Sequence, residues 1–160
     1  MNNSDLAYLV GALEGDGYIY KGKRKGIVAV FTQKNREWLE NIKKIIEENQ
    51  GKAWIFKQRN INVLETKFKP LLEKINIEKL SQKEKLEYVA GFFDAEGGIP
   101  RNPENTPYLY IQFVQKNAET LKRIIKILED SSIEMIKSRH PEKIIRLEKL
   151  KNRLLERQTR

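Results

Sequence analysis

The chain has 160 residues, of which 39% are hydrophobic and 33% are charged, with no cysteine and a single histidine. This composition is typical of a soluble globular protein and excludes a disulfide scaffold, a thiolate metal site and a histidine zinc site. No apolar run approaches the roughly 18 residues of a membrane span, and no secretory signal opens the chain, so we expect a cytoplasmic protein. The net charge of +9 suits a polyanionic partner such as nucleic acid, and equally a basic surface that serves solubility.

The first half of the chain predicts seven elements in the order helix, strand, strand, helix, strand, strand, helix. A short strand follows the first helix, and the turn "KGKRKG" separates it from an alternating strand. The next helix is marked by apolar residues at helical spacing: Trp38, Leu39, Ile42, Ile45 and Ile46. The last helix is expected to carry Phe68, Leu71, Leu72 and Ile75. The expected ranges are 4–15 for the first helix, then 27–33, 52–58 and 61–66 for the longer strands.

Three landmarks of the first half return in the same order in the second half. "YLVGALEGDGYI" at 8–19 is echoed by "YVAGFFDAEGGI" at 88–99, and "FTQKN" at 31–35 by "FVQKN" at 113–117. "VLETKFKPLLEK" at 63–74 is echoed by "RLEKLKNRLLER" at 146–157. Chance similarity would not keep this order, so we interpret the chain as two copies of one unit, residues 1–79 and 80–160.

The second copy predicts the same elements with one uncertain region. Its first helix is expected at 82–95, opened by a capping box between Ser81 and Glu84, and its alternating strand at 108–115. An amphipathic helix follows with Leu121, Ile124, Ile125 and Leu128. The segment "IEMIKSRHPEKIIRLE" is short for a hairpin. One continuous helix is an equal alternative, with an apolar side formed by Ile144, Leu147, Leu150 and Leu154.

The first helix of each copy ends on an acidic residue before glycine, Asp16 in one and Glu96 in the other. The end of a helix carries about half a negative charge, so a carboxylate there is unfavourable unless a cation is present. Small residues four apart, Gly11 and Gly15 in one helix and Gly91 and Ala95 in the other, permit close packing of the two helices. Such packing would bring both carboxylates together as Mg²⁺ ligands, whereas the plain alternative is that glycine merely closes each helix.

The segments "LVGALEGDG" at 9–17 and "VAGFFDAEG" at 89–97 resemble the motif helices of the LAGLIDADG homing endonucleases, in the single-chain type that has two motifs. The resemblance implies an α+β fold in which two pseudo-twofold αββαββα halves each present a curved antiparallel sheet, forming a saddle over double-stranded DNA. It implies Asp16 and Glu96 as catalytic metal ligands for Mg²⁺, with Mn²⁺ as a substitute. It further implies a monomer.

The same resemblance implies further catalytic positions with less support. Gln33 and its repeat mate Gln115 match the polar residue that orders water near the scissile phosphate, and Lys34 and Lys116 follow them directly. Lys69 resembles another pocket lysine, although its repeat mate is Asn152. Each of these residues could instead be an ordinary polar side chain at a strand end or helix start.

Alternation along the strands predicts which side chains face DNA. In "YLYIQFVQ", Leu109, Ile111 and Phe113 would face the helices, and Tyr108, Tyr110 and Gln112 would face outward. In the first copy Ala29 and Phe31 would face inward and Val28 and Val30 outward, while the faces around Trp54 and Phe56 are not assigned. The remaining DNA-binding candidates lie on hairpins and strands: Tyr20, Lys21, Lys23, Arg24, Lys25, Lys57, Arg59 and Arg101.

The sequence therefore favours a site-specific double-strand DNA endonuclease that hydrolyses phosphodiester bonds with a divalent metal. The alternative on the same scaffold is a splicing maturase that binds intron RNA, or a DNA-binding relative that has lost cleavage. A basic structural protein without a site would leave the doubled acidic helix ends unexplained.

Overall fold

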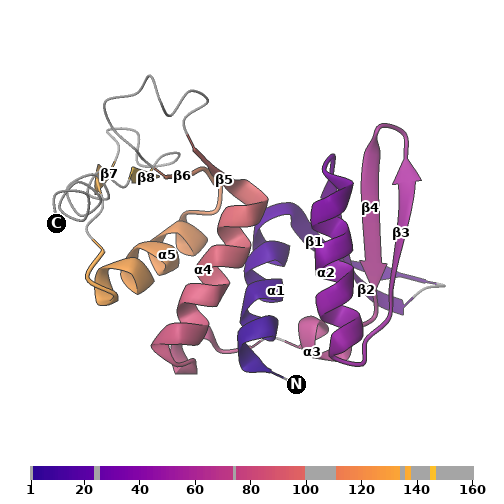
Figure 1. The fold of residues 1–160 in the computed structure, drawn as a ribbon, viewed down its shortest axis with the longest axis horizontal. Coiled ribbons are helices and arrows are strands. Elements are labelled where there is room, and N and C mark those ends of the chain that lie inside the picture. The colour runs from indigo at the N-terminus through magenta and orange to yellow at the C-terminus, as the bar shows by residue number, and fades with distance from the viewer. Residues whose placement is uncertain are drawn as a thin grey trace, which may run out of the picture. The chain divides into compact units, whose positions relative to one another are not determined.

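The computed structural model describes residues 2–23, 26–73, 75–99, 111–133, 136–137 and 145–146 (Figure 1). The chain divides into two compact units, Met1–Ala95 and Glu96–Arg160. This division assigns nearly all of the second motif helix to the first unit, whereas the repeat pattern assigns it to the second copy. The repeat boundary between residues 79 and 80 stays a prediction.

The first unit begins with helix α1 (Asn3–Asp16), which leads directly into the hairpin of β1 (Gly17–Gly22) and β2 (Gly26–Gln33). Helix α2 (Arg36–Glu48) follows, then β3 (Ala53–Gln58) and β4 (Ile61–Thr66). The unit closes with the short α3 (Lys69–Leu72), a 3₁₀ turn at Ile77–Lys79 and α4 (Gln82–Glu96). The helices and strands expected before residue 67 are confirmed to within one residue at each end.

All four strands of the first unit form one antiparallel sheet in the order β1-β2-β4-β3. The pairs Gly17–Phe31 and Phe31–Leu64 set its register. Helices α1 and α2 cover one face, where the expected inward residues Ala29 and Phe31 join a core with Leu9 and Ile42 (Figure 1). The register therefore divides the sheet into a helix-facing side and an outer side.

Two expectations for the first unit need correction. The helix expected to include Ile75 has only four residues, Lys69–Leu72, because the backbone is already extended at its C-cap, Glu73. Val28 and Val30 lie on the outer side as expected, but they are buried rather than exposed, since Val63 packs with them in a small second cluster.

The second unit repeats the strand order of the first sheet among its described residues. Its strands are β5 (Gly97–Gly98), β6 (Gln112–Phe113), β7 (Ile136–Lys137) and β8 (Ile145–Arg146), arranged in the order β5-β6-β8-β7. The pair Gly97–Phe113 reproduces the pair Gly17–Phe31 of the first sheet. Helix α5 (Ala118–Asp130) corresponds to α2, and each begins after an asparagine cap, Asn117 and Asn35.

The uncertain C-terminal region contains a strand pair at its described residues. Ile136 pairs with Arg146 and Lys137 with Ile145, so the hairpin interpretation holds there and a continuous helix through residues 145 and 146 is wrong. The capping box of α4 is also confirmed, because the Ser81 amide donates to Glu84 Oε2 at 2.7 Å and the Glu84 amide donates to Ser81 Oγ at 3.4 Å. No helix in the described ranges has the length and apolar character that crossing a membrane requires.

Candidate nuclease site and nucleic-acid interface

Asp16 is the last residue of α1 and is positioned by a close junction between the helix and the sheet. The Gly17 amide donates to the Leu13 carbonyl, and a Cβ at Gly17 would come within 2.9 Å of the Val30 carbonyl oxygen. Only glycine therefore fits between α1 and β2 at this point. Asp16 is left half-buried, and that burial raises the pKa of its carboxyl.

Gln33, at the end of β2, is the side chain that the structure brings to Asp16. Its Nε2 donates to Asp16 Oδ2 at 2.5 Å, and its Oε1 accepts a hydrogen bond from the Lys34 amide at 2.8 Å. Because Gln33 is held at both ends, its amide is fixed in one orientation beside the carboxylate. Lys34 itself is exposed, at the start of the turn before α2.

Asn62 joins this group from β4 and was not anticipated from the sequence. Its Nδ2 donates to the Lys34 carbonyl oxygen at 2.9 Å. In the sheet register Asn62 lies between Gln33 on β2 and Lys57 on β3, so all three belong to the helix-facing side. A polar residue in the second position after the two-residue turn of the hairpin is the signal that could have indicated it.

The second unit repeats the bond between the strand-end glutamine and the amide of the lysine that follows it. Gln115 Oε1 accepts a hydrogen bond from the Lys116 amide at 2.7 Å, as Gln33 does from Lys34. Glu96 is the last residue of α4, as Asp16 is of α1. Gln112 is half-buried and Phe113 is buried, which agrees with the alternation expected for this strand.

The motif helices α1 and α4 pack at their glycines within the first unit. A Cβ at Gly11 would collide with the Tyr88 carbonyl oxygen, and a Cβ at Gly91 would collide with the Tyr8 carbonyl oxygen. Figure 1 shows the two helices side by side. The expectation of close packing at Gly11 and Gly91 is therefore confirmed, and in each helix the terminal acid comes five residues after the glycine.

Lys69 is not brought to Asp16 by any contact seen in the described residues. Its Nζ lies 3.5 Å from Glu73 Oε1, and its side chain is 84% exposed. It follows the end of β4 at Thr66, whereas Gln33 pairs with Asn62 near the beginning of that strand. Its catalytic role stays a prediction with no geometric support.

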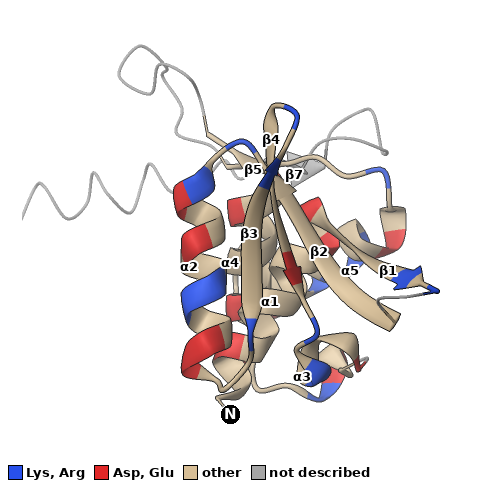
Figure 2. Ribbon diagram, turned by 90° about the vertical axis from the view of Figure 1, so that its right-hand side faces the viewer, with Lys and Arg blue, Asp and Glu red and all other residues tan. Residues whose placement is uncertain are grey.

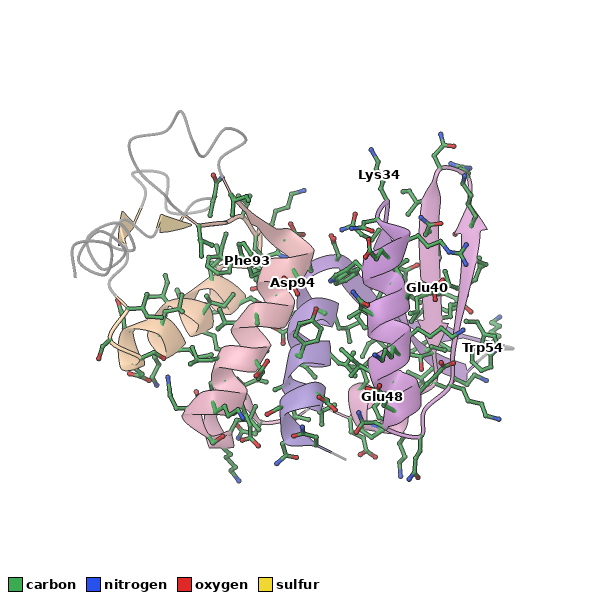
Figure 3. The ribbon with its side chains drawn as sticks, viewed as in Figure 1. Lys34, Glu40, Glu48, Trp54, Phe93 and Asp94 are labelled. Carbon is green, nitrogen blue, oxygen red and sulfur yellow. The ribbon has the colours of Figure 1, made fainter. Side chains whose placement is uncertain are left out.

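The outer side of the first sheet carries exposed aromatic side chains. Tyr18 pairs with Val30, Tyr20 with Val28, and Phe56 with Val63, so these residues share the outer side. The exposed aromatic residues of this surface, which we call the aromatic face, are Tyr18, Tyr20, Trp54 and Phe56. Trp54 points away from α1 and α2 (Figure 3). Trp54 and Phe56 were missed as binding candidates because apolar residues occupy both sides of β3.

The basic residues expected to contact DNA are distributed around this face. Figure 2 shows that the strands of the first sheet are mostly uncharged and that the Lys and Arg of this sheet lie at turns and strand ends. Lys21 pairs with Ile27 and so lies on the helix-facing side, opposite to Tyr20. Lys23 and Arg59 are exposed in turns. Five further candidates lie outside the described residues: Arg24, Lys25, Arg101, Tyr108 and Tyr110.

The carboxylates at the ends of the motif helices suit a hard divalent cation that takes only a few of its ligands from the protein. Within the described ranges, no group of three or more Asp, Glu, His or Cys side chains gathers. Mg²⁺ is commonly held by one or two carboxylates and completed by water and substrate phosphates. The half-buried carboxylate of Asp16, with its raised pKa, would be relieved by such a cation.

Comparison with known proteins supports this fold. Residues 3–67 match the family model of the LAGLIDADG-like domain. The crystal structure of I-DmoI in complex with DNA and Mn is 22% identical, with a TM-score of 0.64 over 96% of this chain and 94% of that chain. I-WcaI bound to its DNA recognition sequence is 18% identical, with a TM-score of 0.63 over 98% of this chain and 80% of that chain.

The similarity extends to a protein that is not described as a nuclease. The N-terminal LAGLIDADG domain of DUF199/WhiA is 14% identical, with a TM-score of 0.68 over 96% of this chain and 80% of that chain. Other matching I-DmoI structures contain DNA with Ca, or target DNA in the presence of Mg. No match was found among curated protein sequences. The chain contains a LAGLIDADG-like domain at residues 3–67 and has the fold of the LAGLIDADG homing endonucleases.

Proposed function

We propose that the protein is a monomeric, site-specific DNA endonuclease that cleaves both strands of a duplex with the help of Mg²⁺ or Mn²⁺. The observation that carries this proposal is the pair of motif helices that cross at Gly11 and Gly91 and end, five residues later, on Asp16 and Glu96. Two carboxylates at helix C-termini are unfavourable for folding alone. A cation-binding site explains why each copy of the repeat has a carboxylate at this helix end.

Asp16 and Glu96 would hold the cation, which when bound polarises the phosphoryl oxygen and stabilises charge on the leaving oxygen. Gln33 and Gln115 would orient water, each held by the amide of the lysine that follows it. The side chains of Lys34 and Lys116 would stabilise the negative charge that develops on the phosphate. Each half supplies one acid, one glutamine and one lysine, and one such trio for each strand would account for cleavage of a duplex.

The aromatic face and the basic residues around it would bind the DNA. Lys23 and Arg59, both in turns, would neutralise phosphates and make binding depend on salt, whereas Lys57 lies on the helix-facing side of the sheet. Tyr18, Tyr20 and Trp54 are more than 45% exposed on one side of the sheet, an unusual density of aromatic surface for a side that faces only water. The I-DmoI and I-WcaI structures that share the fold are DNA complexes, which supports duplex DNA rather than intron RNA as the ligand.

The test is cleavage of a supercoiled plasmid library with and without Mg²⁺. We expect linear products from plasmids that carry one long site, and no products for Asp16→Asn or Glu96→Gln. Glu48→Gln is the matched control, because Glu48 also ends a helix and pairs only at the surface with Lys44. It should cleave like the unmodified protein.

The second candidate is a DNA-binding relative without cleavage, which the similarity to the DUF199/WhiA domain favours. Tight binding to a duplex site without cutting in Mg²⁺ or Mn²⁺ would establish this candidate and exclude the endonuclease. Selective binding of an intron RNA with promotion of its folding would establish the maturase instead.

A further inference from the structure

Two hydrogen bonds join α1 and α4 in a reciprocal pattern. Tyr8 Oη donates to Asp94 Oδ2 at 2.7 Å, and Tyr88 Oη donates to Glu14 Oε2 at 2.6 Å. Tyr8 and Tyr88 are repeat mates, 80 positions apart, and so are Glu14 and Asp94. Each helix therefore gives a phenol to its partner and takes one in return. We call this arrangement the tyrosine clamps.

The clamps lie in an environment that keeps the phenols neutral and donating. Tyr88 is fully buried, and burial followed by the hydrogen bond to Asp94 raises the pKa of Tyr8. A hydrogen bond to an ionised carboxylate is about twice as strong as one between neutral groups. Asp94 lies on α4 beside α1 (Figure 3).

The glycine crossing explains why such clamps are needed. Gly11 and Gly91 bring the helix backbones into contact but provide no side chains that interlock there. The carbonyls of Tyr8 and Tyr88 are the atoms that face Gly91 and Gly11 at the crossing. The side chains of these tyrosines bond to acids three residues beyond the partner glycine, Asp94 and Glu14, and each such bond opposes rotation of one helix about its own axis.

The clamp carboxylates are close in sequence to the proposed metal ligands. Glu14 precedes Asp16 by two residues, and Asp94 precedes Glu96 by two. Two residues along a helix correspond to a rotation of about 200° around its axis. Because the clamp carboxylate is directed at the partner helix, the terminal acid two residues later lies on a different side of its own helix. At Asp16 that side meets Gln33 of the sheet. Any rotation that releases a clamp also moves the terminal acid.

We infer that Tyr8 and Tyr88 are positioning residues, which hold Asp94 and Glu14 and thereby fix the rotational setting of the two acids that bind the cation. This inference rests on the proposed function. The phenols themselves touch neither DNA nor the cation. Loss of one hydroxyl should weaken cation binding more than it weakens the fold.

The experiment compares the unmodified protein with Tyr8→Phe and Tyr88→Phe, which keep the ring and remove only the hydroxyl. Mn²⁺ binding to the complex with target DNA is measured by calorimetry, and the Mg²⁺ concentration for half-maximal cleavage is measured separately. Groups that contact metal ligands directly change metal affinity by about 10- to 100-fold, and these hydroxyls act through the helix rather than on a ligand. We therefore expect each variant to lose about 10-fold or less in Mn²⁺ affinity, with DNA affinity in EDTA unchanged.

Two further variants separate positioning from general stability. Ile46→Val shortens a fully buried side chain of α2 in the same unit, and it should lower the melting temperature without changing Mn²⁺ affinity. Asp94→Asn keeps an oxygen that accepts from Tyr8, so it should retain more affinity than Asp94→Val.

Unchanged Mn²⁺ affinity in both tyrosine variants, with a loss of stability like that of Ile46→Val, would overturn the inference. Absence of Mn²⁺ binding to the unmodified protein would overturn it as well. Mn²⁺ binding to the unmodified protein that weakens in the tyrosine variants would support the inference even without cleavage. Failure of the unmodified protein to cleave any site in Mg²⁺ or Mn²⁺ overturns only the proposed endonuclease.

Discussion

Asp16 illustrates how one residue can be unfavourable for the fold and suited to a function. It ends a helix, where the helix dipole disfavours a negative charge, and it is half-buried beside the sheet. Burial raises the pKa of its carboxyl, and the amide of Gln33 compensates by donating to one oxygen. A residue that costs stability is expected where a cation restores the balance.

The pH dependence of stability should reveal this cost. Because the folded-state pKa of Asp16 is raised, its ionised form destabilises the fold above that pKa, and the cost disappears as the pH falls through it. In EDTA near pH 7.5, Asp16→Asn should raise the melting temperature by about 2 °C. Near pH 3, where the carboxyl is protonated in both states, the difference should vanish. Scanning calorimetry at both pH values measures this, and a lower melting temperature at neutral pH would contradict it.

For individual residues, the sequence predicted which residue types lie at the site better than it predicted which side chains contact one another. The acidic helix ends and the glutamine at the strand end were recognised, and the structure brings Gln33 to Asp16. The tyrosine clamps were not anticipated, because Tyr8 and Asp94 are 86 residues apart and neither follows a local pattern. Such pairs become visible only when two helices have a known register.

Among the elements, the packing of the two motif helices depends on positions that have no side chain. Gly11→Ala or Gly91→Ala places a methyl group against backbone of the partner helix, which cannot move aside as a side chain can. We expect a loss of about 3 kcal/mol or more in the free energy of unfolding. Chemical denaturation measures the loss. Gly98→Ala is the matched control, since a Cβ there meets nothing within 4 Å, and it should be nearly neutral.

The first sheet makes a separate prediction about recognition. Trp54 is 56% exposed on the aromatic face, so Trp54→Ala should weaken binding to a target duplex by about 10-fold, as truncation of an interface tryptophan does. Leu86→Ala removes an exposed apolar side chain from α4 and should leave affinity unchanged. Fluorescence anisotropy with labelled duplex measures both. Equal affinities for the two variants would exclude Trp54 from the DNA interface.

Elements with a single periodic signal were the most predictable from the sequence. α2 and α5 were marked by apolar residues at helical spacing, and both form as expected. The length of α3 was overestimated because Leu71 and Leu72 continue an apolar pattern, whereas the backbone leaves the helical conformation at Glu73. The sides of β3 could not be assigned because Ile55 and Phe56 are both apolar, and only pairing with β4 separates them.

For the molecule as a whole, the repeat is the feature that sequence and structure share most completely. Both sheets have the same strand order, and Gly17–Phe31 and Gly97–Phe113 occupy the same register. The third sequence landmark is corrected by the pairing, because Phe31 pairs with Leu64 and Phe113 with Ile145. The offset between the copies at this strand is therefore 145 − 64 = 81, and the echo of 63–74 at 146–157, which would match Leu64 to Leu147, is displaced by two residues. Under the proposed function, the two copies would supply two sets of site residues, one for each strand of a duplex.

This doubling predicts a distinct outcome when only one set is damaged. Gln33→Ala and Gln115→Ala each remove one glutamine that is held by the lysine amide following it. Each variant should slow cleavage of one strand by about 100-fold and leave the other strand nearly unaffected, so nicked plasmid accumulates. End-labelling each strand of the target should show that the two variants slow opposite strands.

Gln58→Ala is the matched control, because Gln58 is an exposed glutamine at the end of β3 and has no counterpart in the repeated "QKN" segments. It should convert supercoiled plasmid to linear product without a lasting nicked intermediate. If Gln33→Ala and Gln115→Ala slowed both strands equally, the glutamines would act on a single shared centre. The repeat would then serve to build one site rather than two, and the assignment of one glutamine to each strand would be wrong.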